Sequence, residues 1–155
     1  MLTGKKFEAE IKAACIEQSI DFTRLKDAGW QGEKTQRRFT SKNICDCILF
    51  KDGVILFCEV KHRKGALRFD EITQLDELEK KWKPAKGVFS GVLAMLKGKI
   101  FYINTNNIIA MQNRIGKKSF NSTDAGEFGI ELEMITPKGK RKPRPNMGQV
   151  IRSFK

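Results

Sequence analysis

Three residues of the sequence, Asp46, Glu59 and Lys61, have the types and spacing to bind a metal ion and activate water. Glu59 and Lys61 end the apolar stretch 54–61, and Asp46 interrupts the similar stretch 44–50. Carboxylate oxygens prefer hard cations such as Mg²⁺ or Mn²⁺. Such an ion binds a phosphoryl oxygen and lowers the pKa of bound water, while a lysine orients that water or neutralises charge on phosphorus. The lysine alone could not account for catalysis, because one general acid–base residue lowers the activation barrier by only about 3–5 kcal/mol, less than an enzyme typically removes.

The elements that must position these residues are the two strands of a hairpin. Both stretches are rich in apolar, β-branched and aromatic residues, and the three residues between them, 51–53, contain the turn pair Asp-Gly. Side chains alternate along a strand, so positions 59 and 61 share one face, about 6.6 Å apart. We therefore expect Asp46 and Glu59 to lie close together on one side of the sheet.

Four cysteines, at 15, 45, 47 and 58, do not follow a usual zinc spacing. Strand parity places Cys45, Cys47 and Cys58 on the face opposite the two carboxylates. There we expect them to pack under a helix as small hydrophobes, with a metal site or a disulfide as the alternative. Unpaired buried thiols suit a reducing cytoplasm.

The rest of the chain predicts an α/β protein, a mixed sheet with helices packed on it. We expect helices over 5–19, 71–82 and 104–114, the first two capped by Thr3 and Asp70. Further strands are expected over 20–30, 88–96, 99–103 and 128–135, and loops or turns over 31–43, 62–67 and 116–124.

The formal charge of +12 is large for 155 residues and is concentrated at the end of the chain. Residues 137–155 hold seven Lys and Arg and no acid, so we expect one folded domain over 1–136 and a flexible basic arm over 137–155. A basic protein of this kind most often binds nucleic acid, and an anionic membrane is the second most common partner. The alternative is a highly charged surface that is only solvated and binds neither. No apolar run approaches the roughly 20 residues of a membrane span. The cationic candidates for phosphate contacts are Lys34, Arg37, Arg38, Lys42, Lys117, Lys118, Lys138, Lys140, Arg141, Lys142 and Arg144.

The pattern Asp46…Glu59-Val60-Lys61 resembles the core of the PD-(D/E)xK nuclease superfamily. More narrowly, the chain resembles the RecU-type Holliday junction resolvases, especially their phage versions. GKKFE at 4–8 is similar to the family's N-terminal Gly…Glu, ITQL at 72–75 to its Gln-bearing helix, and GKKSF at 116–120 to its late basic motif. Cys45 stands where the superfamily name has Pro, and segment 31–43 is shorter than the stalk of cellular members.

The resemblance implies a single domain with a restriction-endonuclease-like mixed β-sheet flanked by helices. It also implies a homodimeric Mg²⁺-dependent endodeoxyribonuclease, in the cytoplasm of a bacterial or phage-infected cell, that nicks two opposed strands of a four-way DNA junction. Its metal ligands would be Asp46, Glu59 and the Val60 carbonyl. The other residues that it implies are Glu8, Lys61 and Gln74 at the active site and Ser119 on DNA. Two alternatives are a less structure-selective branched-DNA endonuclease and a non-catalytic nucleic-acid-binding module on a decayed nuclease scaffold.

Overall fold

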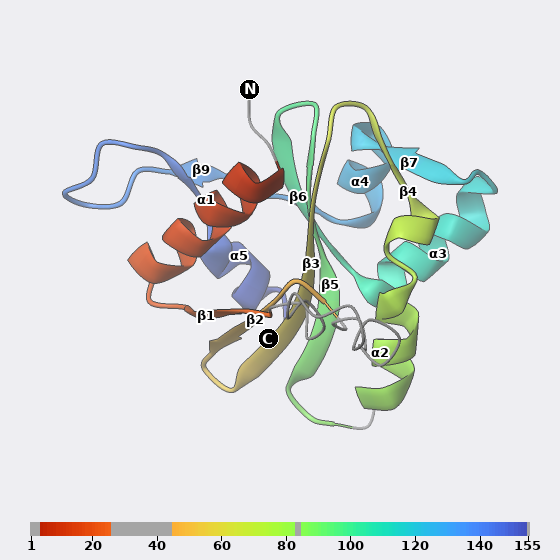
Figure 1. Ribbon diagram of the computed structural model, residues 1–155, viewed down its shortest axis with the longest axis horizontal. Helices are drawn as coiled ribbons and strands as arrows, with labels where there is room; N and C mark the ends of the chain where they lie inside the picture. The colour runs from red at the N-terminus through yellow and green to blue at the C-terminus, as the bar shows by residue number, and fades with distance from the viewer. Residues whose placement is uncertain (1–3, 26–44, 83–84, 155) are drawn as a thin grey trace, which may run out of the picture.

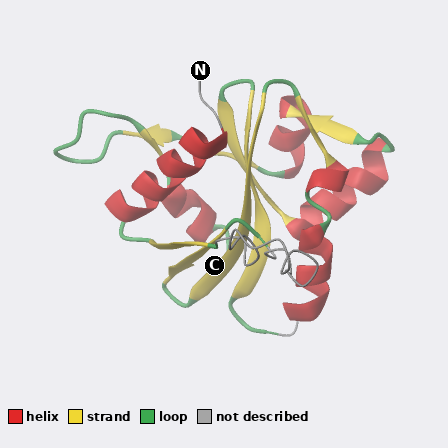
Figure 2. Ribbon diagram, in the orientation of Figure 1, coloured by secondary structure: helices red, strands yellow, loops and turns green. Residues whose placement is uncertain are grey.

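A six-stranded mixed sheet with helices on both faces forms the centre of the molecule (Figure 1, Figure 2). The computed structural model describes residues 4–25, 45–82 and 85–154. In the sheet, β3 and β5 pair in parallel, and the other neighbours pair antiparallel. The strands, in order across it, are β1 (Asp21–Arg24), β2 (Cys47–Lys51), β3 (Val54–Arg63), β5 (Val88–Leu96), β6 (Lys99–Asn104) and β8 (Ile130–Glu131).

The helices divide the core into two layers, one on each face of the sheet. On one face, α1 (Gly4–Glu17) and α5 (Met147–Arg152) cover β2 and β3; on the other, α2 (Gln74–Trp82), α3 (Thr105–Ile115) and α4 (Ser122–Phe128) cover β5 and β6 (Figure 1). Two small sheets extend these layers. They pair β4 (Ala66–Arg68) with β7 (Ser119–Asn121), and β9 (Met134–Ile135) with β10 (Arg144–Pro145).

The predicted hairpin is confirmed. Cys47 pairs with Cys58 and Lys51 with Val54 across the turn Asp52-Gly53, whose φ angles of 53° and 79° suit a tight two-residue connection. We predicted that Asp46 lies within a strand over 44–50. The strand β2 begins at Cys47, so Asp46 lies just before it. The hairpin register therefore sets Asp46 beside the strand residue that follows Cys58.

The expected helix packing is confirmed for the first helix. Its residues Phe7, Ile11, Ala14 and Cys15 recur at helical spacing and are all fully buried against β2 and β3. The predicted helix over 104–114 is also present as α3, with the Asn104 side chain accepting a hydrogen bond from the Asn107 N–H at its start. α1 therefore packs on one face of the sheet and α3 on the other.

Two predictions between the hairpin and the second helix are wrong. Residues 62–67 are not a turn, because β3 runs to Arg63 and β4 begins at Ala66. The helix expected over 71–82 with Asp70 as its cap is divided into a 3₁₀ turn (Phe69–Glu71) and α2. The Glu71 carboxylate accepts the backbone N–H of Arg68, so it caps this short turn and a new helix starts at residue 74.

The predictions for the C-terminal third also need correction. The segment 116–124 is not a loop, because β7 is followed by α4, which starts with reciprocal hydrogen bonds between Asn121 and Asp124. The strand expected over 128–135 is interrupted between β8 and β9. There the Leu132 N–H still donates to the Ile100 carbonyl of β6, whereas the Glu133 N–H donates to the Gln149 side chain, so the chain leaves the sheet after Leu132.

The end of the chain belongs to the core. Met147, Val150 and Ile151 of α5 are buried in the same layer as α1, and Phe154 stacks on Phe89 at 4.1 Å between ring centroids. The flexible arm that we predicted is therefore wrong for the part from β10 onward. In the described residues, no helix is long and apolar enough to cross a membrane.

Candidate active site

The hairpin brings Asp46 and Glu59 together. The Asp46 N–H donates to the Cys58 carbonyl at 3.1 Å, and one Asp46 carboxylate oxygen accepts the Val60 N–H at 2.8 Å. The Leu25 N–H, just after β1, donates to the Asp46 carbonyl at 2.9 Å. Residue 46 is thus held by β1 and β3, with its carboxylate against the backbone of the strand that carries Glu59.

Glu59 is a buried acid whose charged form is unfavourable. It is 5% exposed, and burial raises the pKa of its carboxyl to about 8, with the nearby Asp46 carboxylate adding to the increase. Lys61 opposes this increase, because its Nζ lies 3.6 Å from a Glu59 carboxylate oxygen. The two carboxyl groups are close enough for a hydrogen bond when Glu59 is protonated.

The three groups therefore converge on one side of the hairpin, as the sequence predicted. The Lys61 side chain is 24% exposed, so its ammonium can contact a ligand while it remains paired with Glu59. A buried acid whose pKa is raised by burial and by a neighbouring carboxylate is a common feature of functional sites.

The donor set fits a hard divalent ion. Within the described residues, no group of three His, Cys, Asp or Glu side chains could hold a metal. Mg²⁺ does not need one, since it is commonly held by one or two carboxylates, with water and substrate phosphate oxygens completing its shell. A cation between Asp46 and Glu59 would also offset the repulsion that raises the pKa of Glu59.

Glu8 borders this site from α1. Its carboxylate oxygen Oε1 lies 2.8 Å from Nε of Arg24 on β1, yet among the described residues that oxygen has no well-oriented hydrogen-bond donor. Burial raises the pKa of Glu8, Arg24 lowers it, and the Asp46 charge raises it further. Glu8 is therefore near enough to Asp46 for their charges to interact. The partnership with Arg24 was not predicted, since nothing in the local sequence links the two positions.

Gln74 is placed only in part. It is the first residue of α2, the helix that packs on β5 beside β3, but its side chain lies outside what the structure describes. Its predicted reach toward the acids stays a prediction. Lys34, Arg37, Arg38 and Lys42 also lie outside the described residues.

The other predicted phosphate contacts are in two separate places. Lys117 and Lys118 are exposed just before β7, where Ser119 is half-buried, on the side of the sheet covered by α2, α3 and α4. The other group lies in the connection between β9 and β10, residues 136–143, which projects from the α1 side of the molecule (Figure 1). Its exposed cations are Lys138, Lys140, Arg141 and Lys142.

Arg144 has a different environment from these exposed cations. Its guanidinium donates to Glu10 at 2.7 Å and contacts Glu17 at 3.3 Å, and its side chain is 16% exposed. Lys142 also pairs with Glu10 but is 63% exposed. Arg144 therefore ties β10 to α1 through these ion pairs, while its predicted phosphate contact stays a prediction.

The cysteines pack as predicted. All four are buried free thiols, and Cys15, Cys47 and Cys58 lie in the core layer beneath α1. Burial raises the pKa of Cys15 and Cys45 to about 12, so these thiols stay protonated and unreactive. Cys47 and Cys58 face α1, whereas Glu59 faces the opposite side of the sheet. Its neighbour on β5, Val92, belongs to the other core layer.

Comparison with solved structures identifies the architecture. Hjc of Archaeoglobus fulgidus, a Holliday junction resolvase from an archaeal hyperthermophile, matches with a TM-score of 0.59 and 18% sequence identity, over 97% of this chain and 99% of that chain. The likeness establishes the fold. The predicted single domain with a mixed sheet flanked by helices is thereby confirmed. No protein-family model matches the chain, and no curated protein matches it in sequence.

Proposed function

We propose that this protein is a divalent-metal-dependent endonuclease that resolves four-way DNA junctions. The observation that carries the proposal is the convergence of Asp46, Glu59 and Lys61 on one side of the β2–β3 hairpin. A fold shared with a junction resolvase and a charge of +12 support a branched-DNA substrate. The narrower RecU-type assignment rests on the GKKSF motif at 116–120, and the phage assignment rests on the compact length and the resemblance.

Asp46 and Glu59 would hold the ion, Mg²⁺ or Mn²⁺, with the Val60 carbonyl as a third oxygen. When bound, the ion would supply Lewis-acid stabilisation of a phosphoryl oxygen and a more acidic water. Lys61 would orient the attacking water or neutralise charge on the phosphoryl group from its place beside Glu59. Glu8 would act as a further acid beside Asp46, and Gln74 would assist from the start of α2.

The exposed cations would hold the DNA backbone. Lys117, Lys118 and Ser119 lie on one side of the sheet and the β9–β10 connection on the other, so arms of a branched substrate could be held on both sides of the hairpin. One chain offers one such acid pair among its described residues, whereas resolution needs two opposed nicks. We therefore propose that the active form is a homodimer.

A cleavage assay tests the proposal. Linear, flap and four-way substrates are incubated with the protein, with Mg²⁺ or with EDTA. Paired nicks in the four-way junction that need Mg²⁺ are expected. Equal cutting of all three shapes would favour a less selective nuclease, and binding without any metal-dependent cutting would favour a non-catalytic module.

A further inference from the structure

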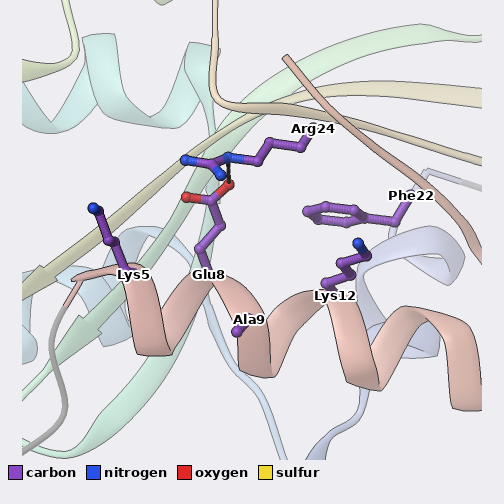
Figure 3. A pocket seen from close by; sticks show the side chains of 6 residues that line it. All are labelled: Lys5, Glu8, Ala9, Lys12, Phe22 and Arg24. Atoms are coloured by element: carbon purple, nitrogen blue, oxygen red, sulfur yellow. Dashed lines mark ion pairs between the residues drawn. The ribbon is translucent and has the colours of Figure 1, made fainter. Parts of the chain in front are cut away.

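A pocket between α1 and β1 has Glu8 at its floor, and its other lining residues have no role in the proposed chemistry. Its volume is about 250 Å³, and Figure 3 shows that its α1 side chains rise toward those of β1. It is lined by Lys5, Glu8, Ala9, Lys12, Phe22 and Arg24. The four α1 residues follow helical spacing on one side of the helix, and the two β1 residues are two apart on one face of their strand.

The lining combines a positive charge with an aromatic wall. Lys5, Lys12 and Arg24 contribute three cations against the single carboxylate of Glu8, so the pocket favours an anionic ligand. Phe22 offers a flat apolar surface on the same wall, and it is only partly buried against the core (Figure 3). Cations beside an aromatic ring match a nucleotide, whose phosphate and base need different partners.

The floor of the pocket offers a hydrogen-bond acceptor. The Glu8 Oε1 atom lies 2.8 Å from Nε of Arg24, with which it forms an ion pair (Figure 3). An N–H group on the edge of a nucleobase is a donor whose hydrogen bond this carboxylate can accept.

The pocket is one strand away from the candidate metal ligands. Arg24 pairs with Cys47, the residue after Asp46, and the adjacent Leu25 N–H donates to the Asp46 carbonyl. A ligand here would therefore lie on the α1 face of the sheet, next to the backbone of Asp46. The volume is below the roughly 300–1,000 Å³ of pockets for drug-sized ligands, so it suits one base and not a base pair.

We propose that this pocket receives one unpaired nucleotide of the DNA strand that is cut, with its base against Phe22 and its phosphate between Lys5, Lys12 and Arg24. The inference rests on the proposed function, because the ligand is DNA at the nuclease site. It adds a demand that the substrate must have an unstacked base near the cut, as at a branch point and not in an intact duplex.

Photocrosslinking tests the pocket without cleavage. Four-way junctions carrying 5-iododeoxyuridine at single positions around the branch point are bound by the full chain in EDTA and irradiated, and the crosslinked peptide is identified by mass spectrometry. We expect a crosslink to Phe22 from one or two adjacent positions, retained in Phe22→Trp and lost in Phe22→Leu. Crosslinks that form only to other peptides would overturn the proposal.

The binding affinity for the junction tests the pocket independently. Phe22→Leu should raise the Kd for the junction about fivefold or more, the lower end of what one base–aromatic stack contributes. Lys12→Gln should also raise Kd, because it removes a phosphate contact. Lys86→Gln, an exposed lysine in the turn before β5, is the matched control and should leave Kd unchanged. Equal Kd values for all variants would refute the pocket. If the native chain forms the Phe22 crosslink but shows no Mg²⁺-dependent cleavage, the proposed nuclease function is refuted and the proposed pocket is not.

Discussion

Replacing Glu59 with Gln should make the metal-free protein more stable, by an amount that grows with pH. The carboxyl has a pKa of about 8 in the folded chain against 4.5 for its ordinary value, so ionisation is easier after unfolding. The protonated Glu59 carboxyl stabilises the folded chain fully below pH 4.5, and this stabilisation is lost as the pH rises toward 8. At 1.36 kcal/mol per pKa unit, the loss is about 1 kcal/mol at pH 5 and about 3 kcal/mol at pH 7. The side chain is 7% exposed, so solvent screens little of this.

The glutamine amide at position 59 of the variant does not ionise and can still donate to Asp46. Urea unfolding in EDTA at pH 5, 7 and 8.5 should therefore give a stability difference between Glu59→Gln and the native chain that widens with pH. Glu127→Gln, at an exposed position of α4, is the matched control and should stay within about 0.5 kcal/mol at each pH. A variant that is less stable than the native chain, or a difference that does not change with pH, would refute the burial argument.

Added Mg²⁺ should narrow this stability difference. An ion that binds only the folded state stabilises it by RT ln(1 + [L]/Kd), and Glu59 is one of its proposed ligands. The native chain should therefore gain stability with Mg²⁺ concentration, while the Glu59→Gln variant should gain little. An equal gain in both proteins would show that the ion binds elsewhere.

Three further predictions follow from the same structure. Asp46→Asn should reduce Mg²⁺-dependent junction cleavage by at least about 10²-fold in a gel assay while EDTA-buffered binding persists; intact cleavage would contradict the site. Changing Lys138, Lys140 and Arg141 to Gln should weaken binding to all DNA shapes and lower the salt slope by up to about 3; a loss confined to four-way junctions would contradict a general phosphate role. Arg144→Met should cost about 1–3 kcal/mol in urea unfolding, against under about 1 for the exposed Lys142→Met; equal losses would contradict its structural role.

The hairpin and its acids were predictable because their geometry is local. The turn at Asp52-Gly53 fixes the register, and the register alone brings Asp46 next to Glu59. The same holds for α1 and α3, whose apolar spacing and, for Asn104, capping side chain are visible in the sequence. Local signals were sufficient wherever neighbouring residues make the contacts.

Contacts between distant segments were not predictable in this way. α5 has only six residues, and its start is held by Gln18, whose side-chain oxygen accepts the N–H groups of Met147 and Gly148. The ion pair between Glu8 and Arg24 depends on how α1 docks over β1. A polar composition hid α4, although the reciprocal cap between Asn121 and Asp124 is a signal that could have revealed it.

The site itself is tested most directly by locating the ion. Crystals soaked in Mn²⁺ and measured for anomalous scattering should show one strong peak between the carboxylates of Asp46 and Glu59, within coordination distance of both. The peak should be absent from the Asp46→Asn variant under the same soak. A Mn²⁺ peak at another place, or none at this acid pair while the protein cuts junctions, would contradict the account.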